Sequence, residues 1–396
     1  RQRRPLLPRT FSAGICRYRE FCAGSTGLTA GEIQPRTTSA KYVLSVCMEQ
    51  KQSRNSSYDI AKGLCIILVV FGHAERGLSS SGAPPHFSPL GFADYAIYTF
   101  HMPFFFFVSG LFFSSGKNTG SIGFIAKLGK NIAYPYLFWS FLHGSLMVVM
   151  GHLGLTNTTI DFARVLEILW SPISPFWFLY ALFFCQLASY GLKNVPALTR
   201  LAFALVLFTL LYFTSHSVLW DTAYGLLYFT LGSVAKQYGF QDRRFGIPSL
   251  LALFVAFAIS TYFSWQAQIP ERLPFVSAIL GIGLVVVLSQ ILASRENPIS
   301  SILKTLGQLS VGIYVMHILA IGFARAVAVK LFHLTDMVSL LAITTFIGVV
   351  FPASVQMVAI RLGIHEWLAL PASAHRRTVK HHTSQPLYPV TQSETD

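Results

Sequence analysis

The stretch from Tyr58 to His73 reads YDIAKGLCIILVVFGH, and the interpretation of the whole chain starts from it. Lys62 stands near its beginning, and His73 closes it after eight consecutive apolar residues, 64–71. An apolar run of this kind predicts a helix within a membrane. Ionisable side chains in such a helix are costly in lipid and usually face a bundle interior or a wet cavity. Lys62 and His73 are therefore candidates for a functional site.

The rest of the chain has the same apolar character. Of its 396 residues, 53% are hydrophobic and only 12% are charged, and the mean hydropathy is +0.53. Soluble proteins carry roughly 25% charged residues. The composition excludes a disordered chain, a small disulfide-bonded protein and an ordinary soluble enzyme, and it predicts an all-α, polytopic membrane protein.

Ten segments each approach the length of about 20 apolar residues that crosses a bilayer as a helix. They cover approximately 58–75, 92–113, 132–151, 174–191, 198–214, 218–237, 246–265, 273–293, 308–331 and 337–360. We expect a bundle of about ten transmembrane helices within one membrane domain, 48–365, and no soluble domain between them.

The basic residues indicate how the bundle is oriented. The formal net charge is +14, from 30 Lys and Arg against 16 Asp and Glu. They gather in alternate connections and in both tails, as the positive-inside rule requires of cytoplasmic segments. This pattern predicts an even number of spans, both termini in the cytoplasm and a multi-pass location in the bacterial cytoplasmic (inner) membrane. The same pattern explains the positive net charge, so we do not expect nucleic-acid binding. The spacing of the five cysteines indicates neither a set of disulfide bonds nor a zinc site.

Two polar ends flank the membrane domain. Residues 1–47 are basic and lack helical periodicity, which predicts a disordered N-terminal extension. One interpretation is that they are not native, because Met48 opens a stretch that resembles a natural start. The other is a basic arm that lies on anionic lipid. Residues 366–396 are predicted to form a polar cytoplasmic tail.

The spacing of Lys62 and His73 places them on one helix face. They are 11 positions apart, close to three helical turns, and are separated by about 16 Å along the axis. They cannot touch each other, but they can contact two ends of one long ligand. Asp59 lies three residues before Lys62 on the same face and can hold its ammonium group. Alternatively, Lys62 reaches to the interface and His73 is a structural donor.

The second predicted span contains His101 in the sequence Phe100-His101-Met102-Pro103. In a helix antiparallel to the first, His101 lies at a depth comparable to that of His73. The two histidines can form an acid/base pair or orient one another. A metal site is not expected, because no carboxylate or third ligand stands near them in the sequence.

These stretches resemble the acyltransferase-3 family of integral-membrane O-acyltransferases. Lys62 and His73 match that family's basic residue and histidine, which are separated by ten residues. The Phe-rich sequence from Phe100 to Gly110 resembles the fucose-acetylase-like branch of the family. Further similar stretches follow in the same order at 135–140, 176–183 and 310–317. The resemblance covers about residues 54–360.

The resemblance implies a reaction and its substrates. The donor would be cytoplasmic acyl-CoA, used as a co-substrate with no bound cofactor. The acceptor would be a sugar hydroxyl of a surface polysaccharide, such as an exopolysaccharide, or of a lipid-linked glycan, and the acyl group acetyl or succinyl. Lys62 and His73 would be the functional pair. Lys127 and Lys130 match a basic-x-x-basic pair that would bind CoA together with Lys62.

The residues themselves fit this chemistry. Acyl transfer to a hydroxyl needs a base, and histidine is suited to that near neutral pH. His73 is either this base or a nucleophile that forms an acyl-imidazole. The transfer also needs a donor to the tetrahedral oxyanion, for which His101, Ser109 and Tyr314 are candidates.

The remaining candidates concern substrate binding. We assign Asp59, Ser109, Trp177, Tyr314 and His317 to this role. The alternative for Trp177 is packing or anchoring at the interface, and the alternative for Tyr314 and His317 is hydrogen bonding between helices. The main alternative to an acyltransferase is a transporter or flippase for a glycolipid or small solute. Such proteins often contain two similar halves, and this sequence shows no internal repeat.

Overall fold

The computed structural model describes residues 38–80, 88–114, 120–153, 160–173, 175–213, 217–295 and 297–372, with side chains from residue 56 onward and gaps at some segment ends. The chain divides into two compact units, Arg1–Gln52 and Ser53–Asp396. Residues 1–37 of the predicted extension and 373–396 of the predicted tail lie outside the described residues. The described helix α2 begins at Thr38, within the predicted extension. All that follows concerns the second unit.

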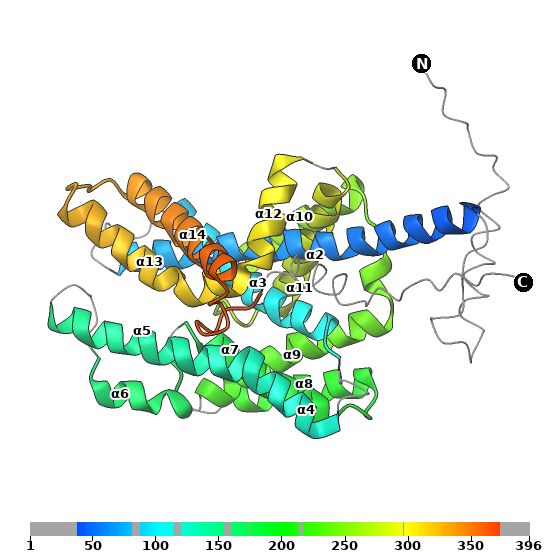
Figure 1. Ribbon diagram of the computed structural model, residues 1–396, viewed down its shortest axis with the longest axis horizontal. Coiled ribbons are helices and arrows are strands. Elements are labelled where there is room, and N and C mark those ends of the chain that lie inside the picture. Colours follow the sequence, from blue (N-terminus) through cyan, green and yellow to red (C-terminus); the bar gives the residue numbers. More distant parts are fainter. Residues whose placement is uncertain are drawn as a thin grey trace, which may run out of the picture. The chain divides into compact units, whose positions relative to one another are not determined.

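The described residues form helices and connections, with no strand among them, which confirms the all-α prediction. The helices, labelled in Figure 1, are α2 Thr38–Ser79, α3 Ser88–Leu111, α4 Gly120–Leu128, α5 Tyr134–His152, α6 Phe162–Leu166, α7 Trp177–Gly191, α8 Ala197–Tyr212, α9 Ser217–Gln237, α10 Ile247–Gln266, α11 Phe275–Ala293, α12 Pro298–Gln308, α13 Ser310–Lys330 and α14 Met337–Leu362. A π-helical stretch, Gly129–Ala133, connects α4 to α5.

Each of the ten predicted spans coincides with a helix. Among the described residues, six helical segments are long and apolar enough to cross a membrane: Ser56–Ser79, Gly120–His152, Ile247–Gln266, Phe275–Ala293, Ser310–Lys330 and Met337–Leu362. The apolar helix α8 is shorter. The chain is thus a polytopic helical membrane protein, whereas ten crossings and cytoplasmic termini stay predictions.

One predicted boundary was wrong. The third span was expected to start near 132, with Lys127 and Lys130 in the connection before it. The structure has one helical segment from Gly120 to His152. Lys127 lies in the last turn of α4 and Lys130 in the π-helical stretch. The apolar residues of α4, such as Ile122 and Ile125, continue the apolar character of α5 and extend the helix.

Helices α2, α3 and α13 fix the direction of the chain around the candidate residues. Tyr58, midway along α2, contacts Phe112 just after α3, with ring centroids 5.1 Å apart. Arg76, late in α2, pairs with Asp94 near the start of α3. These contacts make α2 and α3 antiparallel. Helix α13 runs parallel to α2, since His317 lies beside His73 and Arg325 donates to the Gly77 carbonyl at 2.6 Å.

Glycines allow α12 to pack directly against α2. A Cβ atom on Gly63 would lie 2.0 Å from the Leu303 carbonyl oxygen, and one on Gly307 would lie 1.7 Å from that of Asp59. Neither position has room for a larger residue, because the obstructing atoms are backbone. This close approach fixes the turn that carries Asp59 and Lys62 against the end of α12.

The chain after α14 folds back onto the bundle. The indole nitrogen of Trp139 in α5 donates to the Leu368 carbonyl at 3.0 Å. The Gln356 amide of α14 donates to the Pro371 carbonyl at 3.0 Å. Ala369 and Leu370 are buried. The described beginning of the predicted tail therefore packs against α5 and α14.

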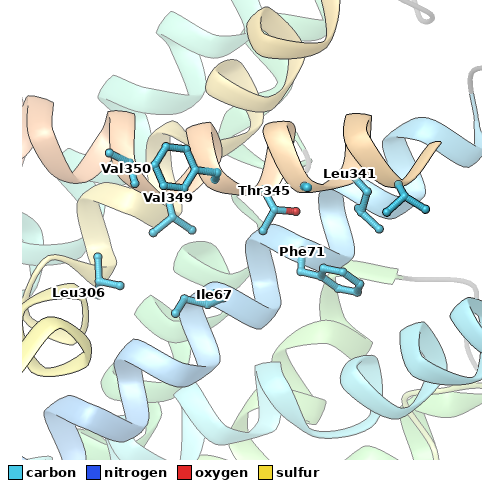
Figure 2. Close-up of a pocket in the computed structure, with 10 residues that line it drawn as sticks. Ile67, Phe71, Leu306, Leu341, Thr345, Val349 and Val350 are labelled. Carbon is cyan, nitrogen blue, oxygen red and sulfur yellow. The ribbon is translucent and has the colours of Figure 1, made fainter. Parts of the chain in front are cut away.

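An apolar groove lies between α2 and α14 (Figure 2). Its volume is about 530 Å³, and Ile67, Phe71, Leu341, Thr345 and Val349 contribute to its lining. His73 is not among the lining residues. It lies two positions after Phe71, about 200° around the helix, so the groove and the histidine occupy different faces of α2.

Candidate active site

The candidate Lys62 pairs with Asp59, which in turn contacts Gln308. The Asp59 carboxylate lies 2.6 Å from the Lys62 ammonium nitrogen, and the two side chains are 17% and 28% exposed. The other Asp59 oxygen accepts a hydrogen bond from the Gln308 amide at 3.3 Å. The predicted contact between Asp59 and Lys62 is therefore present. It orients the ammonium group and leaves it partly accessible.

His73 lies at the centre of a group of aromatic and imidazole rings. Its ring centroid is 5.0 Å from that of His317 on α13 and 6.3 Å from that of Tyr98 on α3. Tyr98 in turn lies 4.6 Å from His101, edge to face. His73 itself is half-buried. The structure thus brings together three of the predicted residues, His73, His101 and His317, and adds Tyr98.

Backbone carbonyl groups define the tautomers of the two flanking histidines. Nδ1 of His317 lies 2.6 Å from the Tyr314 carbonyl oxygen, and Nδ1 of His101 lies 2.7 Å from that of Ile97. Because a carbonyl can only accept, Nδ1 carries the proton in each neutral ring. Nε2 is then an acceptor in both. Nε2 of His317 is buried and has no hydrogen-bond partner among the described residues.

This arrangement suits proton transfer at His73. The His317 ring, which carries the neutral acceptor Nε2, lies beside the His73 ring at a centroid distance of 5.0 Å. It can orient one nitrogen–hydrogen bond of His73 and stabilise the imidazolium that forms when His73 takes a proton. That is the role of the third group in a catalytic triad.

A charged cluster lies just beyond His73, at the end of α2 opposite to Lys62. The Arg76 guanidinium lies 2.8 Å from Asp94 and 3.2 Å from Glu271, which belongs to the connection between α10 and α11. The same guanidinium sits over the Tyr98 ring, 3.2 Å from its centroid. Glu75 is buried beside this cluster and accepts a hydrogen bond from Ser79 at 2.9 Å.

Two of the predicted oxyanion donors use their hydroxyl groups elsewhere. Ser109 donates to the Phe105 carbonyl at 2.8 Å on its own helix, and it lies two turns, about 12 Å, from His101. Tyr314 donates to the Pro175 carbonyl at 2.5 Å. Tyr314 still contributes to the site, because its backbone carbonyl fixes the tautomer of His317. Their predicted roles in substrate contact stay predictions.

Trp177 lies in an aromatic cluster with Phe106 and Tyr224. The Arg272 guanidinium covers its ring at 4.6 Å. Arg272 is itself paired with Asp221 at 2.5 Å. One ring face of Trp177 is thus occupied, which favours the packing interpretation over stacking on a sugar.

Lys127 and Lys130 lie at the Lys62 end of the bundle. Tyr58 contacts Phe112, and Phe113 contacts Phe124 at 6.2 Å, one turn before Lys127. Both lysines are exposed. Lys130 forms an ion pair with Glu366 at 3.3 Å in which both side chains are about two-thirds exposed, 66% and 64%. Such an exposed pair is weak and leaves the lysine accessible to an anion.

The sequence interpretation missed Tyr98, Asp94 and Glu271, and it did not include Arg76 in the site. The sequence could have indicated Arg76, because it follows His73 by three positions and therefore lies on the same helix face. Within the described part of the chain, no group of three or more His, Cys, Asp or Glu residues is arranged to hold a metal ion.

Comparisons with known proteins bear on the family. The acyltransferase domain family matches residues 55–357. The nodulation protein NolL of Sinorhizobium fredii (strain NBRC 101917 / NGR234) is 30% identical over 160 residues, which is 38% of this chain and 39% of that protein. NolL of Mesorhizobium japonicum (strain LMG 29417 / CECT 9101 / MAFF 303099) is 31% identical over 142 residues, 35% of each.

The matched segments thus span little more than a third of these curated relatives. No solved structure matches the chain. The family match, in contrast, begins in the middle of α2 and ends near the end of α14. It includes Lys62, His73, His101 and His317. The chain belongs to the acyltransferase-3 family.

Proposed function

We propose that the protein is a membrane O-acyltransferase that moves an acyl group, acetyl in the first instance, from acyl-CoA to a sugar hydroxyl. The acceptor would be a surface polysaccharide or a lipid-linked glycan. The observation that carries this proposal is the arrangement along α2. A carboxylate-held lysine and a half-buried histidine share one helix face, and the ring of His317, whose Nε2 is buried and unpaired among the described residues, lies 5.0 Å from that histidine by centroid distance.

The donor enters from the Lys62 end in this proposal. CoA carries phosphate groups at one end and its thioester at the other, joined by a long, thin arm. Lys62, Lys127 and Lys130 would bind the phosphates as point charges. The arm would then extend along α2 over the separation of about 16 Å that three helical turns provide. The thioester would lie beside His73.

His73 acts as general base for the transfer. It accepts the proton of the acceptor hydroxyl while that oxygen bonds to the thioester carbonyl carbon. The carbonyl oxygen becomes an oxyanion, and the carbon–sulfur bond then breaks. The proton on His73 passes to the leaving thiolate, giving an ester and free CoA. Nε2 of His317 supports the imidazolium through the intermediate stage, and His101 lies beyond Tyr98 as a second acceptor.

The membrane topology completes the proposal. With the predicted ten crossings and both termini in the cytoplasm, Lys62, Lys127 and Lys130 would lie on the cytoplasmic side of the inner membrane, where acyl-CoA is made. The charged cluster of Arg76, Asp94 and Glu271 then lies toward the opposite side, from which a glycan acceptor can approach His73.

Purified protein in lipid vesicles with acetyl-CoA labelled in the acetyl group tests the proposal. The wild-type protein should release free CoA and pass the label to an added glycan fraction from the host envelope. The His73→Ala variant should remain folded but release no free CoA. His333→Ala is a matched control, since His333 lies exposed after α13. Failure of the wild-type protein to turn over any acyl-CoA tested would contradict the proposal and favour a transporter.

A further inference from the structure

Tyr98 carries a buried hydroxyl group for which no hydrogen-bond partner exists among the described residues. Leaving a buried polar group unpaired costs roughly 1–3 kcal/mol. A phenylalanine at this position would avoid that cost and retain the ring contacts. An unpaired buried group in a native structure therefore calls for an explanation.

The hydroxyl lies over the backbone of α2 next to His73. A Cβ atom built on Gly72 would lie 2.7 Å from Cε2 of Tyr98 and 3.4 Å from its hydroxyl oxygen. Only glycine at position 72 leaves room for the ring there. The ring also lies between two histidines, 6.3 Å from His73 and 4.6 Å from His101 by centroid distance.

One further contact holds the ring in place. The Arg76 guanidinium stacks on its face at 3.2 Å. Arg76 is anchored in turn by Asp94 and by Glu271, at 2.8 Å and 3.2 Å. A cation over the ring face is attracted to the ring electrons and helps to hold the ring in place. The position is thus preorganised, and the donor is not used within the described protein.

We propose that the Tyr98 hydroxyl donates a hydrogen bond to the thioester carbonyl oxygen of the acyl donor and to the oxyanion that it becomes. This inference rests on the proposed function and adds to it the donor that the sequence candidates Ser109 and Tyr314 do not supply. Their hydroxyls are already bonded to backbone carbonyl groups. Among the described residues, only Tyr98 combines an unused hydroxyl with a place beside His73.

The step is a stabilisation and involves no transfer from Tyr98. The acceptor oxygen bonds to the carbonyl carbon, its proton moves to His73, and the carbonyl electron pair becomes the oxyanion. The Tyr98 hydroxyl keeps its proton and shares it with the oxyanion. When the oxyanion re-forms the carbonyl group, the carbon–sulfur bond breaks and the thiolate takes the proton from His73.

Tyr98→Phe tests this role, with Tyr95→Phe as the matched control on the same helix. The Tyr95 hydroxyl donates to the Ile269 carbonyl at 2.7 Å and takes no part in the site. Removing one oxyanion donor lowers kcat by about 10²–10³-fold. Tyr98→Phe should show this loss with an unchanged KM for acetyl-CoA and an unchanged or higher Tm, and Tyr95→Phe should keep the wild-type kcat.

The outcomes separate the two proposals. Wild-type turnover together with an unchanged kcat in Tyr98→Phe would overturn the role of Tyr98 and leave the acyltransferase intact. A lower Tm that accompanies the loss of activity would also overturn it, because it would identify a structural hydroxyl. An equal loss of kcat in Tyr95→Phe would likewise overturn the role of Tyr98. Absence of turnover in the wild-type protein would instead contradict the proposed function itself.

Discussion

Gly72 provides a sensitive test of how the histidine and the tyrosine are arranged. In Gly72→Ala the new Cβ atom would lie 2.7 Å from Cε2 of Tyr98, whereas ordinary van der Waals contact begins at 3.4 Å. The ring must therefore move by at least about 0.7 Å, or α2 and α3 must separate by a similar amount. Arg76 and its two carboxylate partners oppose this movement.

The expected loss of activity follows from this displacement. A shift of about 1 Å in a catalytic group can cost about 10²-fold in rate. We expect Gly72→Ala to lower kcat by about 10- to 100-fold. Overpacking a buried site costs typically 1–3 kcal/mol of stability, so a modest fall in Tm should accompany the loss.

Gly77→Ala is the matched control, because it lies on the same helix and nothing stands within 4 Å of its new Cβ atom. Alanine is the better helix former by about 1 kcal/mol, so this variant should retain kcat with an equal or higher Tm. Release of CoA from acetyl-CoA, measured with a thiol reagent on purified protein, reports kcat for both variants. Full activity in Gly72→Ala would refute the proposed contact between α2 and Tyr98.

Three further predictions concern separate parts of the structure. Lys62→Ala should raise the KM for acetyl-CoA about 10- to 100-fold, as loss of a charged hydrogen bond predicts, with little change in kcat; an effect confined to the acceptor KM would contradict the placement of CoA. His317→Phe keeps a ring but removes the acceptor Nε2, so steady-state kinetics should show kcat lower by about 10²-fold and an unchanged KM; a normal kcat would remove His317 from the mechanism. Asn297→Ala deletes the side-chain cap of α12, an oxygen that accepts from the Ser300 amide at 2.8 Å, and should cost about 1 kcal/mol, seen as a lower Tm with normal KM values; an unchanged Tm would show that the cap is not needed.

The sequence predicts the local features of this protein well. Apolar length is a property of each segment, so all ten predicted spans coincide with helices. The shared face of Asp59, Lys62 and His73 follows from helical periodicity. The bond from Ser109 to the Phe105 carbonyl was also predictable, since serine in a helix commonly donates to the residue four positions earlier.

The contacts between distant segments could not be predicted in the same way. His317 is far from His73 in sequence, and their meeting depends on how α13 packs against α2. The hydrogen bond from the Tyr314 hydroxyl to the Pro175 carbonyl also depends on how distant segments pack. Hydropathy specifies neither the rotation of a helix nor its register against a neighbour. The close approach at Gly72 is likewise visible only once α3 is in place.

The central claim is that a thioester reaches His73 from the Lys62 end of α2. An experimental structure with a non-transferable acetyl-CoA analogue tests this most directly. The account predicts phosphates beside Lys62 and Lys127, and an acyl carbonyl within hydrogen-bond distance of Tyr98 and adjacent to His73. An analogue that binds with its arm directed away from α2, or an acyl group that ends far from His73, would contradict it.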